Sequence, residues 1–161
     1  MVSMPATTVV LPLFHATQTC LGVYTGLYSA IAIYNLQQRE EQTERAAKYS
    51  NTAAHQLHKT RTTQTSGALA TISSTLCSII LAIGPTGGKK LPLFLSLANA
   101  AGIILAYRHI ADFWRHKVKV PFFQDYNEGI RASNQMLQAF QILSGTWIFA
   151  VVVYLWPGLT L

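Results

Sequence analysis

Charged residues are confined to a few short stretches of this chain, and long apolar segments separate them. All six Asp and Glu residues, and ten of the twelve Lys and Arg residues, lie within 37–61 and 108–131. A charge at the centre of a membrane-spanning helix costs roughly 2.5–3.5 kcal/mol. The alternation therefore predicts a polytopic membrane protein. Only 11% of the residues are charged, far fewer than in a soluble domain.

The apolar segments are long enough to cross a bilayer, which takes about 20 helical residues. We interpret residues 1–161 as a single all-α membrane domain, a bundle of four transmembrane helices. The predicted spans cover about 14–36, 63–84, 91–111 and 136–156. The second span is the most polar, but its Ser and Thr residues can bond to carbonyls of the preceding helical turn and are tolerated in lipid.

The distribution of basic residues predicts the topology. Lys89 and Lys90 stand in the GPTGGKKLP turn between the second and third spans, whereas the other ten basic residues lie on the opposite side. The positive-inside rule then makes 37–62 and 112–135 cytosolic and both termini lumenal. Because the basic residues flank spans, the net charge of +6 indicates lipid headgroups as partners and no nucleic acid.

Both cytosolic segments are predicted to continue the helices of the spans. Segment 37–62 has no Gly or Pro, and its pairs Glu41–Arg45 and Glu44–Lys48 have the favourable order for a helix. The third span is expected to run on to Pro121. Along it Asp112 would face Arg108 and Arg115, and Trp114 and Tyr107 would belong to an interfacial aromatic belt.

Several residues inside the spans predict close helix packing. Gly, Ala and Ser recur at every fourth position in three spans, which lets helix backbones approach within one chain or in a homo-oligomer. These stripes are Gly22, Gly26 and Ala30; Ser66, Ala70, Ser74, Ser78 and Ala82; and Ala98, Gly102 and Ala106. Asn99 and Gln141 are expected either to bond between helices or to line a cavity. Cys20 and Cys77 are interpreted as packing residues.

Two kinds of site are possible at the cytosolic end of the third span. His109, Asp112 and His116 share one helix face and offer ligands for zinc or iron, although Arg108 and Arg115 would repel a cation. The alternative is recognition of a carboxylate or phosphate by basic side chains, with a tyrosine donating a hydrogen bond. The residues for that role are Arg108, Arg115, Lys117, Lys119 and Arg131, with Tyr107 or Tyr126.

The four spans, the charged segment after the first and the run YRHIADFW together resemble the family of membrane-associated proteins in eicosanoid and glutathione metabolism. That resemblance implies a homotrimer with glutathione or a lipid bound between subunits, and it puts Tyr107 and Arg108 at matching positions. The segment HQLHKTRTTQTSG keeps Arg61 but has Gln64 or Thr65 where the family has Asn, and it lacks the family's Glu. This departure favours a lipid-presenting member without glutathione chemistry.

Two further resemblances are carried by shorter runs. KTRTTQTSGALA is similar to the start of the second span in the four-span ergosterol-pathway scaffold, and YNEGIRASNQ, with Asn127 and Arg131, resembles the membrane anthrone oxidases. All three families handle bulky lipophilic molecules at an intracellular membrane. The resemblances therefore imply a protein of the endoplasmic reticulum.

The sequence thus predicts a small integral membrane protein that binds, and if catalytic transforms, a lipophilic small molecule such as a lipid, sterol, terpenoid or polyketide. If the protein is an enzyme, we expect Arg108 and Arg131 to stabilise charge, and Tyr107, His109 or His116 to transfer protons. The alternatives are a non-catalytic scaffold that tethers other biosynthetic membrane enzymes and an anthrone-oxidase-like membrane oxygenase. No nucleophile–base pair or phosphate-binding loop is evident.

Overall fold

The computed structural model describes residues 7–38, 40–84, 88–115, 117–118 and 121–156, which form helices and turns without a strand. The helices are α1 (Thr7–Gln37), α2 (Glu40–Ala47), α3 (Asn51–Ile83), α4 (Lys90–Trp114) and α5 (Gln124–Leu155). The prediction of an all-α fold is confirmed.

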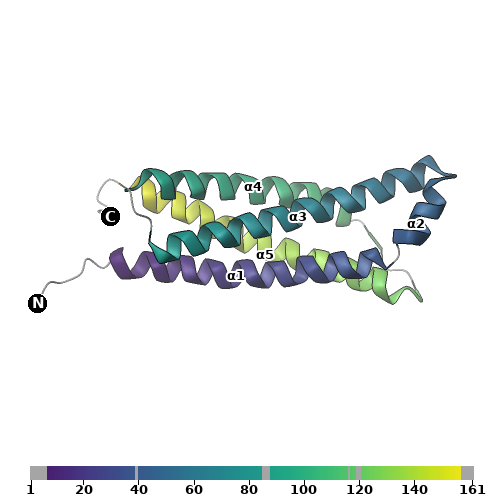
Figure 1. Cartoon of the computed structure of the whole chain (residues 1–161), viewed down its shortest axis with the longest axis horizontal. Helices are drawn as coiled ribbons and strands as arrows, with labels where there is room; N and C mark the ends of the chain where they lie inside the picture. The colour runs from purple at the N-terminus through teal and green to yellow at the C-terminus, as the bar shows by residue number, and fades with distance from the viewer. Residues whose placement is uncertain (1–6, 39, 85–87, 116, 119–120, 157–161) are drawn as a thin grey trace, which may run out of the picture.

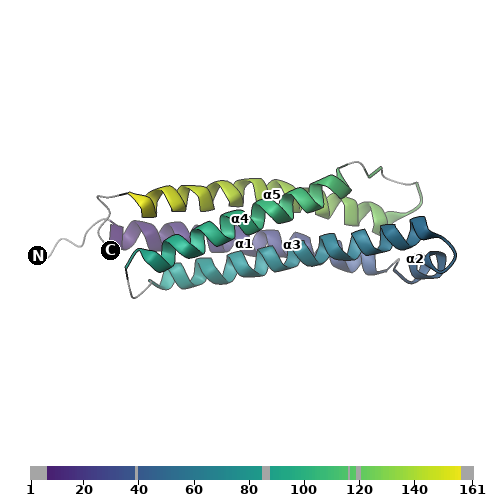
Figure 2. The same cartoon turned by 90° about the horizontal axis from the view of Figure 1, so that it is seen from above.

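The four long helices form an antiparallel bundle (Figures 1 and 2). Helices α3 and α5 each pack against both α1 and α4, whereas the backbones of α1 and α4 lie at opposite corners of the bundle. The start of α1 and the end of α5 lie at one end of the bundle, which we call the terminal end. The short helix α2 lies at the opposite end, which we call the basic end.

Three of the four predicted spans are confirmed as helices long and apolar enough to cross a membrane, namely α3, α4 and α5. They include the Ser- and Thr-rich second span. Helix α1 is not among the helices that meet this test in the described part of the chain. Its apolar run is interrupted by polar residues, among them His15, Gln18 and Thr25.

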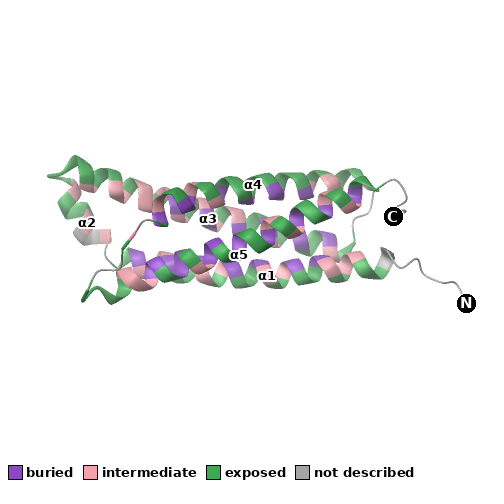
Figure 3. Ribbon diagram, turned by 180° about the vertical axis from the view of Figure 1, so that it is seen from behind, coloured by how far each residue is buried: buried purple, intermediate pink, exposed green. Residues whose placement is uncertain are grey.

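Buried and exposed faces alternate along the long helices (Figure 3), and several polar residues lie on the buried faces while many large apolar residues lie on the exposed ones. On α1, His15, Gln18, Thr25 and Ser29 are buried while large aliphatic side chains of the same helix are exposed. The other buried polar residues are Thr63, Thr71, Ser74, Ser78, Ser96, Asn99 and Ser133. A soluble helix shows the reverse arrangement. The large buried apolar side chains, led by Trp114, Trp147 and Phe140, fill the remaining centre of the bundle.

All four long helices carry exposed large apolar side chains, and we call the part of the bundle that they occupy the apolar belt. On α3 it runs from Leu69 to Ile83, on α4 from Leu91 to Leu105, and on α5 and its C-cap from Ile142 to Trp156. At 1.5 Å per residue each of these stretches is about 21 Å long. On α1 the belt runs further, from Val9 to Ile31.

Segment 37–62 is helical over 40–47 and 51–62, as predicted, but the prediction that it continues the first helix is wrong. Helix α1 ends at Gln37, a separate α2 follows, and α3 begins after Ser50, whose side chain accepts from the Ala53 amide as an N-cap. The guanidinium of Arg61 on α3 binds the carboxylates of both Glu40 and Glu44. The predicted pair of Glu44 with Lys48 is therefore replaced by a contact that holds α2 against α3.

The third helix is also shorter than predicted, because α4 ends at Trp114 and not near Pro121. Trp114 is buried, and its indole N–H donates to Thr63 Oγ1 at 3.0 Å, so it does not belong to an interfacial belt. Asp112 is exposed and forms no ion pair with Arg108 or Arg115 within the described residues. The end of α4 is thus fixed by a tryptophan, and the predicted charge pairs do not form.

Candidate functional site

Two adjoining hollows lie between α4 and α5 on the outside of the bundle, and we call them together the α4/α5 groove. The hollow nearer the terminal end, called the lower hollow, has a volume of about 470 Å³ and is lined by Ile104, Tyr107, Arg108, Gln141 and Ser144. The upper hollow, of about 430 Å³, is lined by Tyr107, Arg115, Asn134, Leu137, Gln138 and Gln141. Tyr107 and Gln141 line both hollows, so they form the partition between them.

The groove crosses the edge of the apolar belt that faces the basic end. Leu105 on α4 and Ile142 on α5 are the last exposed large apolar residues before this edge. Ile104 and Ser144 lie on the belt side, whereas Arg115 and Gln138 lie beyond it. A molecule filling both hollows would therefore contact apolar surroundings at one end and polar side chains at the other.

The partition is held by hydrogen bonds to the hydroxyl of Tyr107. Gln141 Nε2 donates to this oxygen at 2.7 Å, and a guanidinium nitrogen of Arg115 donates to it as well. The Arg115 guanidinium carbon also lies 5.4 Å from the centre of the Tyr107 ring, within cation–π range. The phenol oxygen accepts from two donors, so its own hydrogen is available to a third group.

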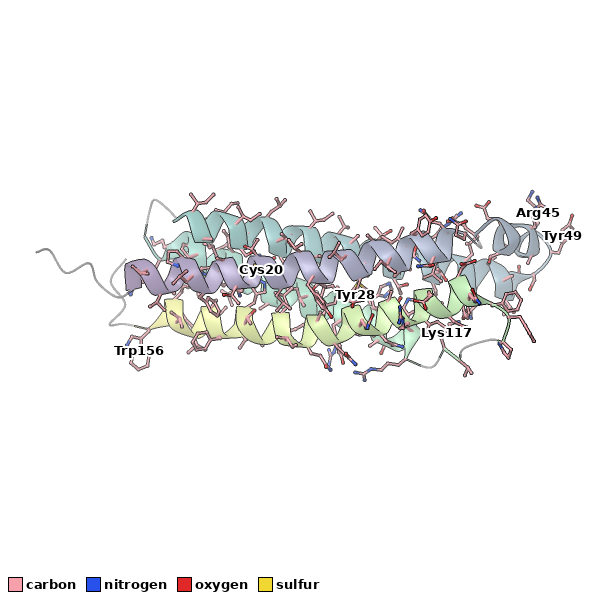
Figure 4. All side chains as sticks on the ribbon, turned by 90° about the horizontal axis from the view of Figure 1, so that it is seen from below. Cys20, Tyr28, Arg45, Tyr49, Lys117 and Trp156 are labelled. Atoms are coloured by element: carbon pink, nitrogen blue, oxygen red, sulfur yellow. The ribbon has the colours of Figure 1, made fainter. Side chains whose placement is uncertain are left out.

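Positive charge dominates the groove. Arg108 and Arg115 are exposed, and neither is paired with a carboxylate in the part of the chain that the structure describes. A third basic residue, Lys117, lies two residues after Arg115 in the chain. Its Nζ donates a hydrogen bond to Gln56 Oε1 at 2.6 Å and lies 4.3 Å from the centre of the Phe113 ring. Burial lowers the pKa of Lys117 below its usual value. Figure 4 shows Lys117 toward the basic end, far from Trp156 at the terminal end.

The remaining predicted site residues do not converge on this groove. His109 lines a different hollow, between α3 and α4. Arg131 is exposed and pairs with Glu128 at 2.7 Å, one helical turn away on α5. His116 and Lys119 lie outside the described residues, so the trio of His109, Asp112 and His116 stays a prediction. Among the described residues no three His, Cys, Asp or Glu side chains come together as metal ligands.

The hollow between α3 and α4 has a volume of about 460 Å³, and five of its lining residues belong to the small-residue stripes of the sequence, namely Ser66, Ala70, Ala98, Gly102 and Ala106. Its walls include Ser66, Ala70 and Ser73 on α3 and Ala98, Gly102 and Ala106 on α4. Asn99 links the two helices, because its Oδ1 accepts from Ser73 Oγ at 3.3 Å. The α4 stripe and the first two residues of the α3 stripe therefore border an open groove on the outside of the bundle, whereas Ser74 and Ser78 are buried inside it.

The sequence analysis missed a buried hydrogen-bond network at the terminal end. His15 is fully buried, its Nδ1 lies 2.6 Å from Gln18 Oε1, and its Nε2 lies 2.7 Å from the Tyr154 hydroxyl. Gln18 Nε2 donates in turn to Thr146 Oγ1 at 3.0 Å. The available signal was His and Gln three residues apart within an apolar segment, which puts both on one helix face.

Comparisons with known proteins identify no relative, since no family model, curated protein or solved structure matches this chain. The family resemblances described from the sequence therefore stay predictions. The candidate function rests on the geometry of the groove and on the polarity of the bundle.

Proposed function

We propose that the chain is an integral membrane protein with four spans that binds a lipophilic small molecule in the α4/α5 groove. The observation that carries this proposal is the position of the groove, whose lower hollow reaches the apolar belt at Ile104 and whose upper hollow lies beyond the belt among polar side chains. The apolar surface that a lipophile needs would come from the adjoining belt, and the polar side chains of the groove would fix the orientation of the molecule.

The polarity of α1 supports its role as the fourth span. Its polar side chains bond within the bundle, where His15 contacts Gln18 and Tyr154, and its outward face carries Val9, Leu13 and Val23. A helix of this kind presents apolar surface to lipid while its polar side chains find partners inside the bundle. The positive-inside rule puts the basic end in the cytosol and the terminal end in the lumen.

Chemistry in the groove would fall to Tyr107 and Arg108, which both line the lower hollow. The guanidinium can stabilise negative charge that develops on a bound molecule. The phenol can exchange a proton with it. Arg131 and His109 lie elsewhere and have no part in this proposal.

The test is to purify the protein in mild detergent and identify bound small molecules by native mass spectrometry and extraction. Ser144→Phe fills the lower hollow, and Ala101→Phe adds the same side chain at an exposed position of α4 that lines neither hollow. We expect a lipophile bound to the wild type and to Ala101→Phe and lost from Ser144→Phe. A lipophile retained equally by Ser144→Phe, or none in the wild type, would contradict the proposal.

A second candidate function, a membrane scaffold, is favoured by the uncovered small-residue groove between α3 and α4. A Cβ added at Gly102 would meet no atom within 4 Å, so the packing of this chain alone does not explain a glycine there. Such a surface admits close approach of another helix. Co-purification of a second membrane protein that is lost on Gly102→Leu would support the scaffold.

A further inference from the structure

The upper hollow of the α4/α5 groove is lined by hydrogen-bonding side chains, and its one charged group, the Arg115 guanidinium, has no anionic partner among the described residues. Of its six lining residues only Leu137 is apolar, and the others carry a phenol, a guanidinium or a carboxamide. Asn134, Gln138 and Gln141 follow one another at helical spacing on α5, facing Tyr107 and Arg115 from α4. The hollow is therefore a polar cup supplied by two helices.

Charge within the cup is uncompensated. The nearest acidic residue along α4 is Asp112, but it pairs with neither Arg115 nor Arg108 in the described structure. Glu128 on α5 is already engaged by Arg131. An arginine beside the low-dielectric belt binds a carboxylate or a phosphate strongly, because two N–H groups of its guanidinium can donate to two oxygens of the anion at once.

The hydrogen of the Tyr107 hydroxyl is a second, independent indication that the upper hollow binds an anion. Its oxygen already accepts from Gln141 and from Arg115, so its hydrogen is free to bond to a further acceptor. Among the described residues none accepts a hydrogen bond from this hydroxyl. An anionic oxygen seated at the partition would accept from the phenol and from the Arg115 guanidinium together.

We infer that the groove selects an oxyanion attached to an apolar chain, a carboxylate or a phosphate, with the anion in the upper hollow and the chain in the lower one. This inference rests on the proposed function and adds the charge of the ligand to it. Arg115 and Tyr107 bind the anion, Arg108 contributes charge at the belt edge, and Ile104 contacts the chain. Both a membrane phospholipid and a free amphiphilic acid have this chemistry.

The experiment measures binding of radiolabelled oleate and oleyl alcohol to the protein in phosphatidylcholine nanodiscs. The two probes share a chain and differ in the anion. We expect oleate to bind about 10- to 100-fold more tightly than the alcohol, as charge-assisted hydrogen bonds imply. Acetate, which has no chain, should not compete. Displacement of oleate by phosphatidate would indicate a membrane phospholipid as the ligand, and its failure to displace would indicate a free acid.

Variants assign the preference to the groove. Arg115→Gln should abolish most of the difference between the two probes, and Arg115→Lys, which keeps the charge, should retain part of it. Lys59→Gln makes the same charge change on α3, outside both hollows, and should leave the difference intact. Melting temperature and elution volume check that each variant is folded.

The outcomes separate this inference from the proposed function. Equal binding of oleate and oleyl alcohol to the wild type, lost in Ser144→Phe, would overturn the anion preference and leave the lipophile site standing. An oleate preference that survives Arg115→Gln would also overturn the assignment. No binding of either probe would overturn both proposals. The wild-type comparison alone is decisive if Arg115→Gln fails to fold.

Discussion

The imidazole of His15 accepts a hydrogen bond from the hydroxyl of Tyr154, with 2.7 Å between Nε2 and the phenol oxygen. The direction follows from the other ring nitrogen, because the Gln18 carbonyl oxygen can only accept and so Nδ1 must carry the proton. Both residues are buried, and their rings are nearly parallel, at 5°. The bond joins the first helix of the bundle to the last at the terminal end.

Removing this phenol should destabilise the bundle. Tyr154→Phe leaves a buried imidazole nitrogen without a donor, and we expect a loss of about 1–2 kcal/mol in the free energy of unfolding. Tyr34→Phe is the matched control, because Tyr34 is 65% exposed and should change stability by less than about 0.5 kcal/mol. Thermal unfolding in detergent measures both variants. Equal melting temperatures would show that the bond contributes nothing.

Two glycines in small-residue stripes should respond oppositely to alanine. A Cβ at Gly22 would lie 2.5 Å from Thr75 Oγ1, so Gly22→Ala should cost about 1–3 kcal/mol through overpacking of α1 against α3. Gly102→Ala meets open space and should gain up to about 1 kcal/mol from helix propensity. Thermal unfolding compares the two.

The Gly102 variant also tests for a homo-oligomer. If native mass spectrometry finds an oligomer that Gly102→Ala weakens, a helix of another copy covers the α3/α4 groove. An unchanged mass together with a gain in stability would mean that no helix packs there.

Phe122 should be replaceable by glycine with a gain in stability. Its φ is 68°, the left-handed region in which a side chain other than that of glycine costs about 1–2 kcal/mol, and it is fully exposed. It follows Pro121, as glycine does in a type II turn. Phe122→Gly should raise the melting temperature by about 2–4 °C. Phe123→Gly should lower the melting temperature, because Phe123 has an unstrained φ of −114°. Glycine there relieves no strain and only raises the conformational entropy of the unfolded chain.

The bundle should be most stable in a thin bilayer. Its apolar belt on α3, α4 and α5 is about 21 Å long, against a hydrocarbon core of about 30 Å in a typical bilayer. Each ångström of mismatch costs a fraction of a kcal/mol. We expect a higher melting temperature in phosphatidylcholine nanodiscs with 14-carbon chains than in those with 22-carbon chains. The reverse order would mean that the belt underestimates the membrane-embedded region.

Part of the candidate site was accessible from the sequence. YRHIADFW identified Tyr107 and Arg108, because a basic–aromatic run at the end of an apolar segment marks a membrane edge. Gln141 was recognised as a polar residue that must bond or line a cavity, and it does both. The separation of His109 and Arg131 from the groove was not accessible, since it depends on which face of each helix meets its neighbour.

The sequence by itself determined the helical class, the approximate limits of the apolar segments and the concentration of charge at one end. These properties are local or compositional, because helix formation and lipid compatibility depend on runs of neighbouring residues. Tertiary structure alone decided the break before α2, the burial of Trp114 and the network around His15. Each depends on a partner far along the chain, namely Arg61 for α2, Thr63 for Trp114 and Tyr154 for His15. Spacing along one helix carries no information about such partners.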